Sequence, residues 1–285
     1  MARQTVEAVG AKAEQLYKGI GVLKIAVTAV AILFVAILMA MTGRGGGNFY
    51  VPILVATGIS MHQAATTAQL ILFLTAVAAS LAFHKGRTID WKLAMAIDPP
   101  TDIMALIGGF YAHLLPGASL KFVFAGLLVL AGFCMLYPAS GRSQTYRKRF
   151  GFWRRKFAGE QYVVNLWLAL PITAATGLFA GMVGISGGSF KVPLMVLACG
   201  VPVRVAVGTS SAMVAATALM GFVGHSAAGD LNAAYAIPMG VVAVTGGLLG
   251  GMFSLKTQPR NLKRIFAYTT LAAAVFMAAN AFWLS

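Results

Sequence analysis

The chain has 285 residues, of which 59% are hydrophobic and only 10% charged, whereas a soluble domain is about 25% charged. This composition excludes an ordinary soluble protein and indicates a membrane protein. The net charge of +15 would also suit a nucleic-acid partner, but the basic residues lie in short links between apolar runs and form no groove-reading motif. We interpret them as signals of membrane topology.

Several apolar runs approach or exceed the roughly 20 residues that cross a bilayer as a helix. Among them are residues 19–41, 120–137, 162–183, 233–253 and 266–284. None shows the alternation of a lipid-facing strand, so we expect helical spans. Residues 1–19 combine mixed charge with apolar side chains at helical spacing, which is typical of an amphipathic helix at the membrane interface rather than of a cleaved signal.

One glycine-rich stretch occurs twice. Residues 43–53 read GRGGGNFYVPI and residues 184–194 read GISGGSFKVPL. Each copy follows a long apolar run and leads through an aromatic residue and Val-Pro into a short apolar segment. Further residues of the first half match residues of the second half in the same order along the chain. Residue 58 matches residue 200, residues 66–69 match 208–211, residue 84 matches 225, residue 90 matches 230, and residues 120–125 match 262–267. We infer an internal duplication.

The basic links predict how the two halves are oriented, because cytoplasmic links collect Lys and Arg. The link at 142–156 holds seven such residues and is expected on the inside. In the first half, three more lie in the link at 85–92, whereas the equivalent link at 226–232 has none and residues 256–264 carry them instead. This swap predicts that the halves are inverted.

An inverted repeat needs an odd number of crossings in each half. The short segments at 49–57 and 190–199 would each cover about 15 Å, which is about half of the hydrocarbon core. We therefore expect an all-α integral membrane protein with two inverted repeats, each of about three transmembrane helices plus a broken or re-entrant helical hairpin, and roughly seven or eight spans in total. This scheme places the N-terminus outside despite Arg3, Lys12 and Lys18. Four crossings per half with parallel repeats is the alternative.

The chain is accordingly divided into four parts. They are an N-terminal amphipathic interfacial segment (1–19), a first transmembrane repeat (20–139), a basic cytoplasmic linker (140–161) and a second transmembrane repeat (162–285).

The two short segments break at equivalent positions, which predicts a binding site near the middle of the membrane where they meet. The polar groups available there are mostly amides and hydroxyls, which can bind a small oxyanion without a permanent counter-charge that would trap it. Glycines and small hydroxyl residues also form packing surfaces between membrane helices, but two copies at helix breaks favour a site. The candidate substrate-binding residues are Arg44, Gly45, Gly46, Gly47, Asn48, Thr66, Thr67, Gln69, Ser186, Gly187, Gly188, Ser189, Gly208, Thr209, Ser210 and Ser211.

Arg44 breaks the symmetry of the two copies, because its counterpart is Ile185. It either contacts the substrate or anchors the chain by snorkelling to the membrane surface. Lys191 and Arg204 raise the same question in the second half.

Asp98 and Asp102 are the acids expected within a span. Being four residues apart, they would share one face of a helix, although the proline pair after Asp98 disturbs that geometry. Ionisable groups inside a membrane are costly and usually functional, so we consider both as proton-coupling candidates. The alternative is that Asp98 caps a helix beginning at Pro99.

The sequence offers nothing for catalysis. No histidine pair has metal-ligand spacing on one helix face, and no nucleophile elbow, phosphate loop or metalloprotease motif occurs. Cys134 and Cys199 lie at unmatched places of the repeat and are expected to pack rather than to pair. We therefore expect no metal, no cofactor and no enzymatic activity.

Taken together, the paired glycine-rich stretches with Val-Pro, the Gly200-Val201-Pro202 turn leading to Gly208-Thr209-Ser210, and the halves joined by a basic link resemble the TauE/SafE sulfite exporter family of membrane permeases. The likeness covers residues 21–281. It implies a multi-pass transporter of the bacterial inner membrane that moves sulfite, organosulfonates or thiosulfate, generally out of the cell. It also implies that the pathway is lined by Gly45, Gly46, Gly47, Gly187, Gly188, Ser189, Gly208, Thr209 and Ser210. The first half departs from this pattern, with Thr66-Thr67-Ala68 in place of Gly-Thr-Ser.

We thus expect a secondary transporter of small sulfur-containing anions that works by alternating access between the two halves. Its expected partners are that anion, the lipid bilayer, protons as a coupling ion and further copies of the chain in a homo-oligomer, with no nucleic acid. The alternatives are a carrier of another small organic anion such as a carboxylate, an anion channel, or a membrane scaffold.

Overall fold

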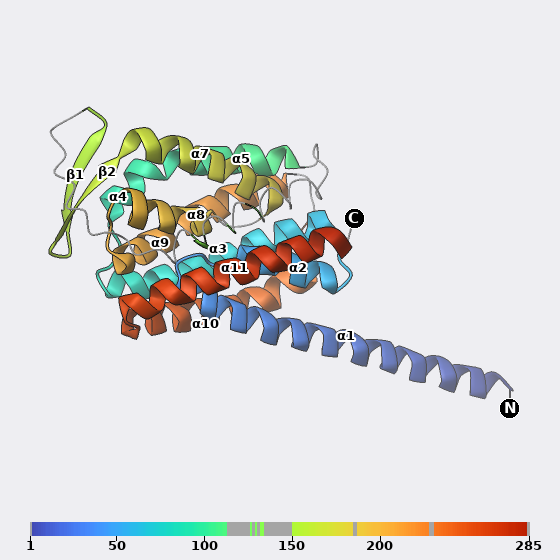
Figure 1. Ribbon diagram of the computed structural model, residues 1–285. Helices are drawn as coiled ribbons and strands as arrows, with labels where there is room; N and C mark the ends of the chain where they lie inside the picture. The colour runs from blue at the N-terminus through green and yellow to red at the C-terminus, as the bar shows by residue number, and fades with distance from the viewer. Residues whose placement is uncertain are drawn as a thin grey trace.

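The computed structural model describes residues 2–112, 126, 129, 132–133, 150–184, 187–227 and 231–283, and most of them are helical. Within this part of the chain, five helices are long and apolar enough to cross a membrane. They are α1 (Ala2–Met41), α3 (Met61–Lys85), α7 (Leu166–Val183), α9 (Val203–Ser226) and α10 (Ala233–Lys256). The protein is therefore a multi-pass helical membrane protein, as its composition predicts (Figure 1).

The two segments predicted to cover half of the membrane are short helices. They are α2 (Gly47–Ala56) and α8 (Gly188–Pro193), the latter continuing as a π-helical turn over Leu194–Ala198. Each contains the proline of its Val-Pro pair, which removes a backbone donor. Helix α2 continues past Pro52, whereas α8 ends at Pro193. The remaining helices are α4 (Trp91–Ile97), α5 (Pro99–Phe110) and α11 (Pro259–Trp283).

Helices α3 and α9 form the centre of the molecule (Figure 1). About two thirds (67%) of the most apolar window of each is buried, against 22% for α1. Large apolar side chains of α1, such as Val30 and Phe34, are more than 60% exposed. In a membrane protein such a surface faces lipid, so α1 lies at the periphery.

Side-chain contacts fix the directions of the packed helices. The Ser80 hydroxyl, late in α3, lies 3.3 Å from that of Ser211, early in α9, whereas Gln69, early in α3, lies against Gly221, late in α9. These two helices therefore run antiparallel. Helix α10 runs parallel to α3, because Gly247 packs on Thr75 and Gly251 packs on Ala79. Helix α5 runs parallel to α9, because Asp102 contacts Thr217 and Leu106 contacts Gly224.

Glycines bring several of these helices into backbone contact. A Cβ atom added to Gly177 or Gly181 of α7 would lie 2.2 or 2.3 Å from a backbone oxygen of α5. Gly250 of α10 packs in the same way on α1, at 2.4 Å from the Ile37 carbonyl. Such small-residue seams are the usual means by which membrane helices approach closely.

A β-hairpin, which was not predicted from the sequence, precedes α7. Strands β1 (Phe152–Phe157) and β2 (Glu160–Asn165) pair antiparallel through a turn at Ala158-Gly159, both of which have positive φ. Helix α7 consequently begins at Leu166 rather than within the apolar run that starts at 162, with Asn165 capping it through a 3.4 Å bond from the Leu168 amide.

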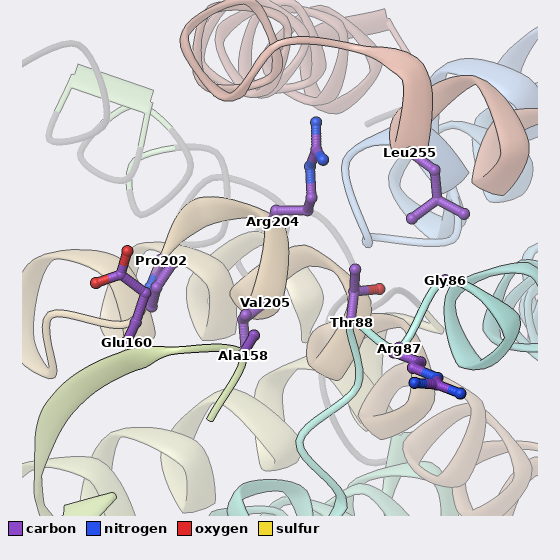
Figure 2. Close-up of a pocket in the computed structure, with 9 residues that line it drawn as sticks. All are labelled: Gly86, Arg87, Thr88, Ala158, Glu160, Pro202, Arg204, Val205 and Leu255. Atoms are coloured by element: carbon purple, nitrogen blue, oxygen red, sulfur yellow. The ribbon is translucent and has the colours of Figure 1, made fainter. Parts of the chain in front are cut away.

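The hairpin turn, the α3–α4 loop, the start of α9 and the end of α10 surround one pocket of about 440 Å³ (Figure 2). Arg204 donates to the Thr257 carbonyl at 2.9 Å and so ties the start of α9 to the end of α10. Basic links from both halves therefore gather at a single end of the molecule, which we call the basic end. The pocket is lined by Gly86, Arg87, Thr88, Ala158, Glu160, Pro202, Arg204, Val205 and Leu255.

Candidate functional site

The two glycine-rich stretches meet inside the protein. Asn48, one residue into α2, donates from Nδ2 to the Ser189 hydroxyl, one residue into α8, at 3.0 Å. Both residues are buried. A Cβ atom on Gly188 would lie 2.9 Å from Cα of Arg44 and 3.0 Å from the Gly43 carbonyl. The structure thus brings together the loops of both halves and the first turns of both short helices.

Glycine is required at the bend that leads into α2. Gly45 and Gly46 have φ values of 73° and 105°, in the region that disfavours residues with a Cβ atom. A Cβ atom on Gly45 would also lie 2.4 Å from the Leu72 side chain, and one on Gly46 would meet the Tyr50 ring at 2.6 Å. These contacts explain the glycines structurally, while the N-terminus of a helix is also a place that suits an anion.

Arg44 is buried rather than snorkelling, with a relative exposure of 1%. Its Nε donates to Thr42 at 3.1 Å and its Nη1 to Thr270 of α11 at 2.5 Å, while Nη2 donates to Thr269. The guanidinium carbon lies 4.6 Å from the centre of the Phe266 ring. Among the described residues, no carboxylate forms an ion pair with Arg44. The site therefore holds a cation whose hydrogen-bond partners are neutral.

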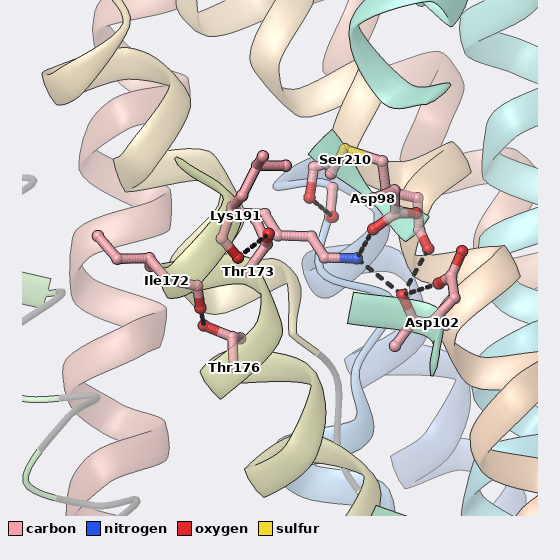
Figure 3. A network of polar contacts seen from close by, with 11 residues as sticks. Asp98, Asp102, Ile172, Thr173, Thr176, Lys191 and Ser210 are labelled. Carbon is pink, nitrogen blue, oxygen red and sulfur yellow. Dashed lines mark hydrogen bonds and ion pairs between the residues drawn. The ribbon is translucent and has the colours of Figure 1, made fainter. Parts of the chain in front are cut away.

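Lys191 of α8 lies in a second polar cluster (Figure 3). Its Nζ forms an ion pair with Asp98 and donates to the Thr217 hydroxyl of α9 at 2.7 Å. That hydroxyl in turn lies 2.8 Å from Oδ1 of Asp102. Asp98 stands at the position before α5 but makes no side-chain capping bond there, so the capping alternative does not describe its carboxylate. The pairing of Lys191 with Asp98 was not predicted from the sequence.

The Gly-Thr-Ser motif ties α9 to its surroundings. Ser210 donates to the Gly43 carbonyl at 2.8 Å, and Thr209 accepts from the Asp90 amide at 3.0 Å. Ser211 lies 3.4 Å from the Ala76 carbonyl, and Gly208 packs on Thr88, where an added Cβ atom would lie 2.6 Å from the hydroxyl oxygen. The motif therefore holds both the first glycine-rich loop and the α3–α4 loop.

The matching residues of the first half make related contacts. Thr67 accepts from the Asn232 amide at 3.4 Å, while Thr66 donates within its own helix to the His62 carbonyl at 3.1 Å. Gln69 is buried against Gly221. Thus Thr67 and Thr209, which are equivalent, each contact a loop of the opposite half. Ser186, the remaining candidate, lies outside the described residues.

Asp90 binds the hairpin to the rest of the protein. It forms an ion pair with Arg155 at 2.5 Å, accepts from the Tyr162 hydroxyl, and caps α4 by accepting from the Leu93 amide at 3.1 Å. Burial alone would raise the pKa of Asp90, but the hydrogen bonds from Arg155, Tyr162 and Leu93 outweigh it and lower the pKa below its usual value. From the sequence, Asp90 was predicted only to correspond to Asp230 in the repeat. The signal that could have indicated its role is that Asp90 is an acid in a link predicted to lie on the same side of the membrane as the strongly basic link at 142–156.

No group of three His, Cys, Asp or Glu residues within the described ranges could hold a metal ion. Cys199 is buried and free, and Cys134 lies outside the described residues.

The polar groups of the site belong to a chain whose residues 28–277 match the family model described as Sulfite exporter TauE/SafE. The chain belongs to the TauE/SafE family. This TauE/SafE protein is similar to the probable membrane transporter protein YunE of Bacillus subtilis, with 28% identity over 79% of this chain and 87% of YunE. It is also similar to a probable membrane transporter protein of Xylella fastidiosa, with 25% identity over 84% of this chain and 89% of that protein.

A third relative is the probable membrane transporter protein MamO of Paramagnetospirillum magneticum, which is 26% identical over 87% of this chain but only 44% of its own length. No solved structure matches the chain. Family and relatives together identify a membrane transporter of the TauE/SafE type.

Proposed function

We propose that this TauE/SafE protein is a secondary transporter of the bacterial inner membrane that carries small sulfur-containing anions, such as sulfite, organosulfonates or thiosulfate, generally outward. The observation that carries this proposal is Arg44, a buried cation that has only hydroxyl partners and a ring face among the described residues.

A cation buried without an anion is costly, because neutral hydroxyls replace only part of the hydration that it loses. A bound substrate anion would supply the missing charge. The planar guanidinium group suits an oxyanion, since two of its N–H groups can pair with two oxygens at once. The backbone of Arg44 touches the second glycine-rich stretch at Gly188. The loop that carries this cation therefore packs directly on the second glycine-rich stretch.

Alternating access follows from two inverted repeats that meet at this site. Several contacts support the inversion. The equivalent residues Asn48 and Ser189 touch each other, and the equivalent helices α3 and α9 run antiparallel. Helix α5 runs beside α9 as α10 runs beside α3. We propose that the two halves rock against each other about the glycine-rich bends, exposing the site to each side in turn.

The basic end is assigned to the cytoplasm, because Lys and Arg collect on that side. Labelling tests this assignment and the inversion together. Lys85→Cys, at the end of α3, is expected to react from the cytoplasm, and Leu231→Cys, before α10, from the outside. Both residues are exposed. Labelling of both from the same side would contradict the inverted arrangement.

Counterflow in proteoliposomes tests the transport function. Labelled sulfite should accumulate transiently in vesicles loaded with unlabelled sulfite, and passive equilibration alone would indicate a channel. Arg44→Gln should abolish accumulation, while Arg87→Gln removes the same charge at an exposed position and should not. A response to lactate or acetate but to no sulfur anion would favour the carboxylate alternative, and normal counterflow by Arg44→Gln would remove Arg44 from the site.

A further inference from the structure

The Lys191 cluster consists of Lys191, Asp98, Asp102 and Thr217. The Thr217 hydroxyl bonds to both Lys191 and Asp102, and Asp98 joins the cluster through its ion pair with Lys191. Lys191 belongs to α8, Asp98 stands just before α5, Asp102 lies in α5, and Thr217 lies in α9. The neighbouring helix α7 faces α5 with glycines and carries no ionisable residue. His225, two turns beyond Thr217, binds the Gly181 carbonyl at 2.8 Å.

Counting charges shows what the cluster can hold. With both carboxyl groups ionised, one lysine and two aspartates sum to −1, and with one carboxyl protonated they sum to zero. Net charge in a buried, membrane-spanning site is costly. Lys191 and Asp98 have relative exposures of 1% and 5%. The cluster is therefore built to take up a proton.

Lys191 also borders the glycine-rich stretch of the second half. A Cβ atom on Gly187 would lie 3.4 Å from Cε of Lys191 and 3.2 Å from the Thr176 side chain. An ammonium group released from Asp98 would thus lie next to the backbone that we assign to the substrate. While the ion pair is intact, Asp98 neutralises the Lys191 ammonium group, so the substrate anion does not pair with it.

We propose that proton binding to Asp98 releases Lys191 to bind the substrate anion, so that proton and anion load together. This proposal rests on the anion transport proposed above. In the loading step a hydronium ion gives its proton to the Asp98 carboxylate and is left as water, and the Lys191–Asp98 ion pair is exchanged for a Lys191–anion pair. The site gains one positive and one negative charge, so its net charge does not change. The coupling is therefore one proton for each negative charge carried, and outward transport runs whenever the outward gradient of the anion exceeds the inward gradient of protons.

The repeat supports a role confined to one half. Tyr50 occupies the position of Lys191 in the first copy, and its hydroxyl lies 3.1 Å from that of Thr75, the counterpart of Thr217. The same contact is therefore neutral in the first half. Helix α10, which runs along α3 as α5 runs along α9, contains no acidic residue. Charge is thus present at only one of two equivalent places, as a single coupling site requires.

Asp98→Asn provides the test, because it mimics the protonated carboxyl permanently. With purified protein in proteoliposomes, sulfite counterflow without a pH gradient should persist in this variant. Sulfite accumulation driven by an imposed pH gradient should fall at least about tenfold, and an internal pH dye should no longer report proton entry with sulfite. Glu160→Gln, which removes an exposed acid of the hairpin, should keep both activities. Asp98→Glu should restore coupling and show that the site folds.

Each result is decisive. Gradient-driven accumulation with an unchanged proton-to-sulfite ratio in Asp98→Asn would overturn the coupling proposal. Loss of counterflow in a folded Asp98→Asn protein would overturn it as well, because a released Lys191 should bind the anion. If the unmodified protein shows no counterflow with sulfite, organosulfonate or thiosulfate, the transport proposal itself fails, and that failure is distinct from either of the others.

Discussion

Asn48 hydrogen-bonds to Ser189, the residue at the same position of the other glycine-rich copy. When equivalent positions of a repeat touch, they lie close to the axis that relates the two copies. The first turns of α2 and α8 both start at this point. The second polar atom of the Asn48 amide, Oδ1, is buried and has no hydrogen-bond partner among the described residues. A buried polar atom without a partner is unusual, and a ligand at this place would supply one.

Asn48→Asp tests whether an anion passes this contact. The substitution keeps the size of the side chain and introduces a negative charge beside the two helix N-termini, so the affinity for sulfite should fall at least about tenfold through like-charge repulsion. Asn48→Ser serves as the control, because it makes the first copy match the second. Sulfite affinity measured by thermal shift or by counterflow would decide, and equal affinity in Asn48→Asp would place the anion elsewhere.

The Asp90 contacts predict that the hairpin undocks in acid. Because the pKa of Asp90 is lowered in the folded protein, its ionised form contributes stability that is fully present above its unfolded value of about 4 and is lost as pH falls through the lowered pKa. Asp90→Asn should therefore be less stable than the unmodified protein at pH 7, and the difference should shrink at low pH. Hydrogen exchange of residues 152–165 measures it. A constant difference across the pH range would contradict the assignment.

The α5–α7 seam predicts a strong effect of side-chain size. Gly181→Leu would place its side chain against the backbone of Ala105, so the free energy of unfolding should fall by about 1–3 kcal/mol or more. Gly126→Ala is the control, since no described atom lies within 4 Å of its new Cβ atom. Thermal unfolding in detergent would show a lower Tm for the first variant only. Equal Tm values would mean that the helices are not in backbone contact.

Ser80 and Ser211 offer a way to stop the proposed rocking motion. Their hydroxyl oxygens are 3.3 Å apart across the antiparallel α3–α9 contact, so cysteines at both positions should form a disulfide on oxidation. If the halves must move against each other, counterflow should stop in the oxidised double variant and return after reduction. Each single cysteine variant should be insensitive to the oxidant. Unchanged transport in a fully cross-linked protein would exclude relative movement of α3 and α9.

The repeat allowed much of this arrangement to be predicted from the sequence. The glycine-rich stretches, their short helices and the convergence of polar residues all follow from a pattern that occurs twice. The partner of Lys191 could not be predicted in this way, because Asp98 is 93 residues away in the sequence and has no acidic counterpart in α10. A comparison of the two copies shows that such a residue is unmatched, but it does not indicate which distant residue pairs with it.

The hairpin was missed for a different reason. The strand sequence FWRRKF places basic residues among aromatic ones, and we assigned the basic residues to topology alone. The strand FWRRKF does not alternate apolar and charged residues, so it lacks the period-two pattern that would have indicated a strand with one covered face. In β1 the guanidinium carbon of Arg155 lies 5.0 Å from the centre of the Trp153 ring. A basic residue of this link therefore also contributes to the packing of the hairpin.

The exchange of helices between the halves bears on how the chain is assembled during synthesis. Helix α5 finds its neighbours in α7 and α9, which are made later, and α10 returns to α1 and α3, which are made first. A nascent chain that ends after the hairpin therefore exposes two aspartates that still lack Lys191 and Thr217. The first half therefore completes this cluster only when α8 and α9 have been synthesised, and its two carboxyl groups lack their partners until then.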